Sequence, residues 1–141
     1  MKAVVDANVA LALVLPLPYS PQAQALWESW RAPGTLIYAP DLWAYEITAA
    51  LRKAMVTLRL PLPEAETRLQ TLLALGVRLA APTMELHLRA LLWAERAGQT
   101  VAYDGHYLAL AEALNCEFWT ADARLARGLQ NQYPWVRLLQ P

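Results

Sequence analysis

Short runs of branched apolar residues alternate along this chain with longer segments whose apolar residues recur at helical spacing. The first run, Ala3-Val4-Val5, has the composition of a strand that is covered on both faces of a sheet. Similar runs predict further strands at 36–38, 77–79, 116–120 and 135–139. The periodic segments predict helices at 9–15, 20–31, 41–55, 64–75, 82–98, 107–114 and 121–129.

These elements follow one another in the order β-α-α-β-α-α-β-α-α-β-α-β. Strands that alternate with helices are typical of an α/β fold, so we expect a layered sandwich around a mostly parallel sheet. No internal repeat, linker or low-complexity tract interrupts the pattern. Residues 1–141 are therefore expected to form a single domain.

Polar residues at the ends of helical segments predict local roles. Ser20 and Asp41 stand where helices are expected to begin, and both residue types are good N-caps. In the segment at 64–75, Leu69, Leu72 and Leu73 are expected to face the core.

Composition narrows the class of protein. An apolar content of 57% with 17% charged residues excludes a disordered chain. Asp6 and Asn8 interrupt the apolar N-terminal segment, so we expect neither a signal peptide nor a membrane span, and a protein of the cell interior. The single Cys116 cannot form an internal disulfide, which fits a reducing compartment.

The formal net charge is zero. A broad basic surface for nucleic acid normally shows in the overall charge balance, and none does here. The distribution of charge matters more, because acidic residues gathered in one pocket leave the rest of the surface net positive.

Four acidic residues stand at element ends or beside apolar stripes. They are Asp6, after the first strand; Glu46, in the helix after Asp41; Asp104, near a helix start; and Asp122, after the strand at 116–120. Ligands of open α/β sheets bind outside the carboxyl ends of the strands, where Asp6 and Asp122 fall. Carboxylates gathered there would need a hard cation such as Mg²⁺ or Mn²⁺, since like charges this close otherwise force protonation.

Each of these residues also has a local explanation. Asp6 alone could begin a turn, and Glu46 could be a solvated helix residue. Asp104 gains from the helix macrodipole without any ligand, and Asp122 could cap the next helix. His106 is expected to be a solvated helix residue, with a contact to substrate phosphate as the alternative. Local patterns do not establish that residues so far apart in the chain meet.

Four blocks of sequence carry a resemblance to a known family. They are Val-Val-Asp-Ala-Asn at 4–8, Pro-Asp-Leu-Trp-Ala-Tyr-Glu-Ile at 40–47, Tyr-Asp-Gly-His-Tyr-Leu-Ala-Leu-Ala-Glu at 103–112 and Phe-Trp-Thr-Ala-Asp at 118–122. In this order they resemble the PIN-domain nucleases, and most of all the small single-domain toxins of VapC type. Gly105-His106 is a small departure, because the family often has Ala or Thr at the first of these positions.

The resemblance implies a fold, a site and partners. The fold is a Rossmann-like three-layer sandwich, and the metal site is built from Asp6, Glu46, Asp104 and Asp122, with Asn8 and Thr120 as polar neighbours. It also implies Mg²⁺- or Mn²⁺-dependent endonucleolytic cleavage of RNA in the cytoplasm by a homodimer that a cognate antitoxin holds inactive. Trp27 and Trp30, one helical turn apart, are then candidates for a dimer face or antitoxin groove.

Other functions remain alternatives at this point. A non-catalytic module could hold a metal and RNA without turnover. A phosphatase with an aspartyl nucleophile is less favoured, because Asn8 occupies the position where a second acid is expected. A phospho-receiver domain would need adjacent acids early in the chain and a lysine close to the pocket, and Lys2 and Lys53 are poorly placed for that role.

Overall fold

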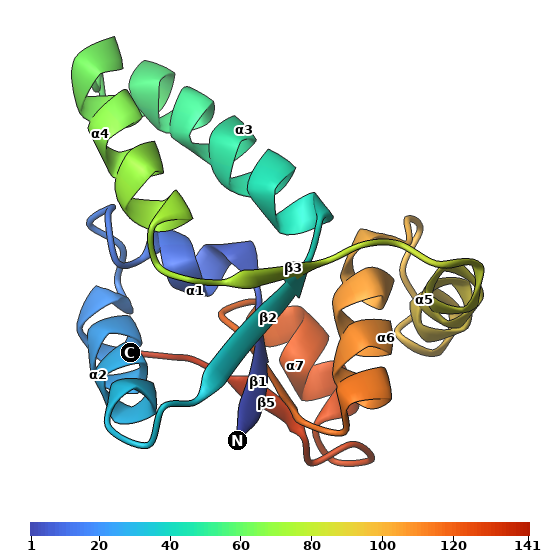
Figure 1. Ribbon diagram of the computed structural model, residues 1–141. Coiled ribbons are helices and arrows are strands. Elements are labelled where there is room, and N and C mark those ends of the chain that lie inside the picture. Colours follow the sequence, from blue (N-terminus) through green and yellow to red (C-terminus); the bar gives the residue numbers. More distant parts are fainter.

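Five strands form one parallel sheet in the computed structural model, which describes residues 1–141 (Figure 1). They are β1 (Lys2–Val5), β2 (Leu36–Pro40), β3 (Arg78–Ala80), β4 (Glu117–Thr120) and β5 (Val136–Leu138). Their order across the sheet is β3-β2-β1-β4-β5, and every neighbouring pair is parallel. The apolar first run of the sequence is thus the central strand, and the expectation of a mostly parallel sheet is confirmed.

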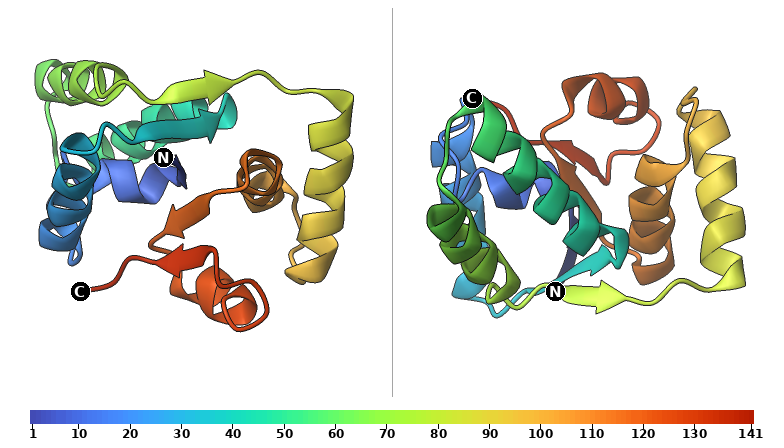
Figure 2. Two further views of the ribbon diagram at one scale, coloured as in Figure 1. Left: turned by 60° about the horizontal axis from the view of Figure 1, so that its bottom comes forward. Right: turned by 90° about the horizontal axis from the view of Figure 1, so that it is seen from above.

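Seven helices connect the strands and cover the sheet (Figure 2). They are α1 (Ala7–Leu11), α2 (Ser20–Arg31), α3 (Leu42–Thr57), α4 (Leu62–Leu73), α5 (Met84–Arg96), α6 (Tyr103–Leu114) and α7 (Ala123–Leu129). The order of strands and helices is the one that the sequence predicts. None of these helices combines the length and the apolar character that a membrane crossing requires.

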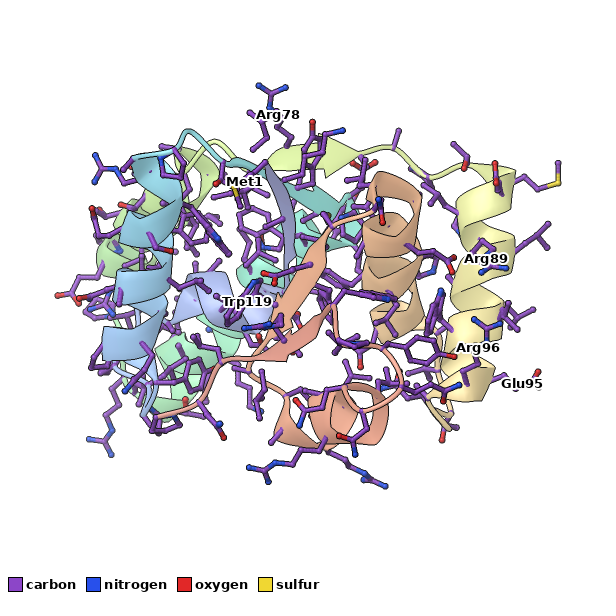
Figure 3. All side chains as sticks on the ribbon, turned by 90° about the horizontal axis from the view of Figure 1, so that it is seen from below. Met1, Arg78, Arg89, Glu95, Arg96 and Trp119 are labelled. Carbon is purple, nitrogen blue, oxygen red and sulfur yellow. The ribbon has the colours of Figure 1, made fainter.

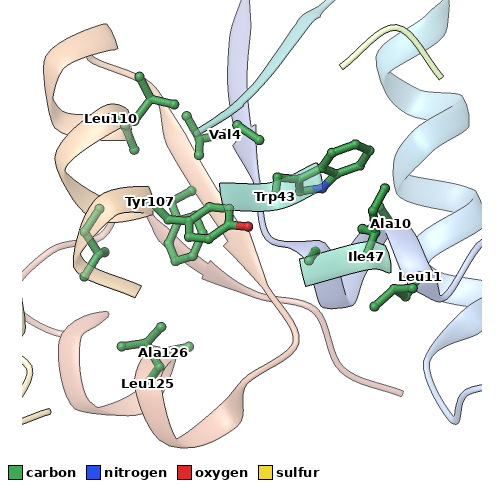
Figure 4. Packing of buried hydrophobic residues seen from close by; sticks show 14 of the residues in the cluster. Val4, Ala10, Leu11, Trp43, Ile47, Tyr107, Leu110, Leu125 and Ala126 are labelled. Atoms are coloured by element: carbon green, nitrogen blue, oxygen red, sulfur yellow. The ribbon is translucent and has the colours of Figure 1, made fainter. Parts of the chain in front are cut away.

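The central strand separates two apolar cores because successive side chains of a strand point to opposite faces. Val4 belongs to the larger core, which α3, α6 and α7 help to form (Figure 4). Val5 belongs to the smaller core, which is covered by α2. Within that core Trp27 and Trp30 are each 8% exposed, with ring centroids 5.4 Å apart. The prediction that these tryptophans present a partner surface is therefore wrong.

Several local expectations need correction. The first helix ends at Leu11 rather than Leu15, because tight turns precede Pro16, which disfavours helical backbone in the residue before it. Ser20 does not cap α2; its hydroxyl donates to the Leu15 carbonyl at 2.8 Å. Leu73 is 55% exposed, although Leu72 of the same helix is fully buried.

Asp41 also departs from its expected role. It directly precedes α3, but its backbone is helical (φ −51°, ψ −31°) and its side chain makes no capping hydrogen bond. A capping residue normally has extended backbone, which turns its side chain back toward the free N–H groups of the helix. The Asp41 carboxylate is therefore not used by its own helix.

Two features hold α5 on α6 at the edge of the molecule (Figure 3). The first is the close approach of Gly105 to the backbone of Ala90, which leaves no room for a Cβ atom. The second is a bidentate ion pair, in which Arg89 donates to both Glu112 carboxylate oxygens at 2.8 and 2.6 Å. Glycine at position 105, unusual against the expected pattern, is thus explained by packing.

Candidate metal and nucleic-acid site

Asp6 lies at the carboxyl end of the central strand, where the order of strands reverses between β1 and β4. Its backbone N–H donates to the Trp119 carbonyl at 2.9 Å, so the ladder with β4 continues up to this residue. The side chain is only 6% exposed. A buried carboxylate at the switch point of a parallel sheet lies where ligands of such folds bind.

A small polar network holds the Asp6 side chain. The Thr120 hydroxyl donates to Asp6 Oδ2 at 2.8 Å, and the Asn8 amide donates to the same oxygen at 3.3 Å. Asn8 is itself fixed, because its Oδ1 accepts from the Ala121 N–H at 3.0 Å. The structure thus places both predicted polar neighbours, Asn8 and Thr120, directly on Asp6.

The charge environment of Asp6 is strongly acidic. Burial is the largest influence and raises the pKa of Asp6 to about 7, against the lowering effect of the Thr120 hydrogen bond. The negative charges of Asp104 and Glu46 raise the pKa further. These three carboxylates, from three separate parts of the chain, therefore influence one another electrostatically.

Glu46 projects from the first turns of α3. Burial raises its pKa, the hydrogen bond from Tyr107 opposes the rise, and the charge of Asp104 adds to it. The Tyr107 hydroxyl donates to Glu46 Oε1 at 2.6 Å. Burial and the neighbouring acids raise the pKa of Tyr107, so its hydroxyl keeps its proton and remains a donor.

Asp104 and Asp122 line a common cavity of about 360 Å³ between the start of α6 and the start of α7. Asp104 Oδ2 accepts a hydrogen bond from the Gln99 amide at 2.7 Å. Asp122 Oδ1 accepts from the Leu125 N–H at 3.1 Å and so caps α7. The local explanation of Asp122 is correct, and its second oxygen makes no hydrogen bond within the protein.

Each of the four carboxylates has its own hydrogen-bond donor, and none forms an ion pair with Lys or Arg. As they stand, no three acidic, histidine or cysteine side chains are grouped closely enough to hold a metal ion. The chemistry of the donors nevertheless fits Mg²⁺ or Mn²⁺, because these cations prefer carboxylate oxygens. A cation would also offset the repulsion that raises the pKa values of Asp6 and Glu46.

Two residues of the site escaped the sequence reasoning: Tyr107 and Gln99. Tyr107 was expected only as part of a helix, and its spacing of one turn from Asp104 is the sole local signal. Gln99 lies between α5 and α6 in a segment without periodic pattern. Their roles depend on neighbours that the fold supplies.

Comparison with known proteins places the chain among characterised relatives. The family model described as the PIN domain matches residues 3–128. The VapC ribonuclease Mb0985 of Mycobacterium bovis is 39% identical over 131 residues, which cover 93% of this chain and 94% of that protein. Ribonuclease VapC9 of Mycobacterium tuberculosis matches with the same identity and coverage.

Solved structures share the fold. VapBC2 from Rickettsia felis, bound to a DNA fragment from the promoter, superposes with a TM-score of 0.68 at 13% identity, covering 98% of this chain and 97% of that one. PAE2754 from Pyrobaculum aerophilum superposes with a TM-score of 0.65 at 22% identity, covering 91% of this chain and 79% of that one. At such identities the likeness concerns the fold alone.

Proposed function

Because the chain belongs to the PIN domain family, we propose that it is a divalent-metal-dependent endoribonuclease that hydrolyses RNA phosphodiester bonds. Relatives that are 39% identical over nearly their whole length are named ribonucleases, which supports this activity. One observation carries the proposal: the buried Asp6 shares its charge environment with Glu46 and Asp104 at the switch point of the sheet.

In this proposal Asp6, Glu46, Asp104 and Asp122 hold Mg²⁺ or Mn²⁺. Such a cation, when bound, lowers the pKa of a water ligand and stabilises negative charge on a phosphodiester. The chain's own contribution is to position the ligands, since outer hydrogen bonds fix the orientation of carboxylates at metal sites.

The positioning residues act on one carboxylate each. Thr120 and Asn8 orient Asp6, Tyr107 orients Glu46, and Gln99 orients Asp104. Asp122 lines the cavity that it shares with Asp104, and its Oδ1 caps α7. Each of the four acids is thereby held by a neighbouring hydrogen-bond donor.

We also propose the biological setting of a toxin with a cognate antitoxin, acting as a homodimer on RNA in the cytoplasm. The relatives are VapC ribonucleases and two structural neighbours are VapBC proteins, which supports an antitoxin partner. Exposed apolar residues offer surface for such contacts on the α3–α4 pair and on α5: Val56, Leu58, Leu62, Leu73, Met84, Leu88 and Leu91.

The proposal is tested by incubating the purified, antitoxin-free protein with a mixed cellular RNA pool in Mg²⁺, in Mn²⁺ or in EDTA. Asp6→Asn and Asp104→Asn remove one carboxylate each, and Glu66→Gln, on the exposed face of α4, serves as the control. Fragments that need the cation and disappear in the first two variants support the proposal. Cleavage that survives in both variants contradicts it, and RNA binding without cleavage by any form would favour the non-catalytic module.

A further inference from the structure

A second cavity lies beside the carboxylate site, at the carboxyl ends of β2 and β3. Its volume is about 270 Å³, and residues from the start of α3, the segment after β3, α5 and α6 line it. Five side chains with aromatic rings or hydrogen-bonding groups line it together with apolar residues: Asp41, Tyr45, His87, Tyr103 and His106. None of these five belongs to the carboxylate set.

The helices α3 and α6, which carry Glu46 and Asp104, also line this cavity. Strand β2, which leads into the cavity, lies next to β1, which leads into Asp6. Tyr45 directly precedes Glu46 on α3, and Tyr103 directly precedes Asp104 on α6. An RNA strand with a phosphate at the carboxylates therefore has a neighbouring base close to this cavity.

The walls of the cavity suit a flat aromatic ligand. Tyr45 and Tyr103 are 74% and 59% exposed, so their rings are accessible at the surface. The rings of His87 and His106 meet edge to face, with centroids 5.0 Å apart and an interplanar angle of 88°. Unpaired bases stack on Tyr and His side chains in proteins that bind single-stranded RNA.

Asp41 is the one acidic residue that lines the cavity. Its carboxylate is half-buried, caps no helix and forms no ion pair or hydrogen bond. Covering such a group with a ligand that offers no donor costs free energy. Guanine presents two adjacent N–H donors on its Watson–Crick edge, which match the two oxygens of a carboxylate. Adenine and cytosine present one amino group there, and uracil presents one imide N–H.

We propose that this cavity binds an unpaired base of the RNA substrate, with guanine preferred through Asp41. The inference rests on the proposed ribonuclease function and names a base next to the bond that is cut. An apolar side chain of a partner protein would match the apolar part of the lining but would offer no donor to Asp41.

Binding without metal separates this proposal from catalysis. Dye-labelled heptaribonucleotides of uracil with a single central G, A, C or U are titrated with protein in EDTA, and fluorescence anisotropy gives the affinity. The forms compared are the wild type, Asp41→Asn, Tyr103→Ala and the ring-preserving control Tyr103→Phe. Repulsion from the metal-free carboxylates is the same for all four RNAs, so the ratios of affinity isolate the effect of the base.

We expect the wild type to bind the G-containing RNA about tenfold more tightly than the others, a typical discrimination for a two-hydrogen-bond base contact. Asp41→Asn should lose this preference, and Tyr103→Ala should weaken all four RNAs about fivefold or more while Tyr103→Phe does not. Equal affinities in the wild type, or a G preference that Asp41→Asn retains, overturn the proposal. Failure of the wild type to cleave RNA with metal contradicts the ribonuclease function instead and leaves this base preference measurable.

Discussion

The Tyr107 hydroxyl donates a 2.6 Å hydrogen bond to Glu46 Oε1, joining α6 to α3 across 61 positions of the sequence. The Tyr107 ring is fully buried in the larger core and its oxygen points toward α3 (Figure 4). The core thus extends a polar group into the acidic site and holds one of its carboxylates. Packing and site geometry are coupled at this contact.

Tyr107→Phe keeps the ring and removes only the donor. We expect the rate of RNA cleavage or the affinity for metal to fall about 10–100-fold, because Glu46 loses the group that orients it. The free energy of unfolding should change by about 1 kcal/mol. Initial cleavage rates over a range of Mg²⁺ concentrations measure the effect. Tyr133→Phe, which removes a hydroxyl from the Trp93 cluster instead, is the control, and equal rates for both variants would count against a positioning role.

Asp6 makes the metal-free protein sensitive to pH. The pKa of its carboxyl is about 7 in the folded chain and near its ordinary value of 3.8 in the unfolded chain. The folded state therefore holds a proton that the unfolded state has released between these values. Stability falls as pH rises through that window, by at most about 1.4 kcal/mol per pH unit, and levels off above it.

Asp6→Asn removes this titration. In EDTA we expect the variant to unfold at a higher temperature than the wild type at about pH 8, with the difference shrinking toward about pH 4. Mg²⁺ should stabilise the wild type more than the variant at the same concentration. Thermal unfolding followed by circular dichroism measures both effects. A difference between the two proteins that stays constant with pH would show that the charge of Asp6 is not the cause.

Asp122 combines two roles that two substitutions can separate. Asn is also a good N-cap, so Asp122→Asn should preserve stability while it removes a negative charge from the cavity. Asp122→Ala should lose both the helix cap and the negative charge, and its free energy of unfolding should fall by about 1 kcal/mol. Metal affinity and thermal unfolding of the two variants are compared. If Asp122→Asn binds metal as the wild type does, Asp122 is a helix cap alone.

Gly105 is required where α6 passes closest to α5. A Cβ atom there would overlap the Ala90 carbonyl, so Gly105→Ala must push the two helices apart. We expect a loss of about 1–3 kcal/mol in the free energy of unfolding, the usual cost of overfilling a packed contact. Activity should fall as well, because Asp104 lies on the same turn. Gly128→Ala, at a position with open space, is the control. Urea unfolding of both variants measures the loss, and equal stability would contradict this account of the contact.

The sequence predicts the order of strands and helices because apolar residues recur with a different length and period in the two kinds of element. These patterns mark the positions that are buried in the fold. That Asp6, Glu46, Asp104 and Asp122 form one site is implied by the family resemblance and not by any local pattern. The sequence does not predict that Asp41 leaves its helix uncapped or that α1 stops at Leu11. The helical backbone of Asp41 has no mark in the local sequence, whereas the turns before Pro16 are a local effect that the apolar spacing of 9–15 hides.

The same limit explains the partners of the carboxylates. The local pattern predicts a helix at Tyr107 and a loop at Gln99, and it gives no sign of their contacts. The fold brings Tyr107 to Glu46 and Gln99 to Asp104. The prediction that Trp27 and Trp30 form a partner surface fails because aromatic residues suit both cores and interfaces. In this fold both tryptophans are buried in the smaller core.

Binding of Mn²⁺ tests most directly whether the four carboxylates form one metal site. Electron paramagnetic resonance reports free Mn²⁺ in titrations of the wild type, Asp6→Asn, Asp104→Asn and the control Glu66→Gln. A shared site predicts saturable binding by the wild type and Glu66→Gln, with affinity reduced about tenfold or more in the other two variants. Equal binding by all four proteins would contradict the site.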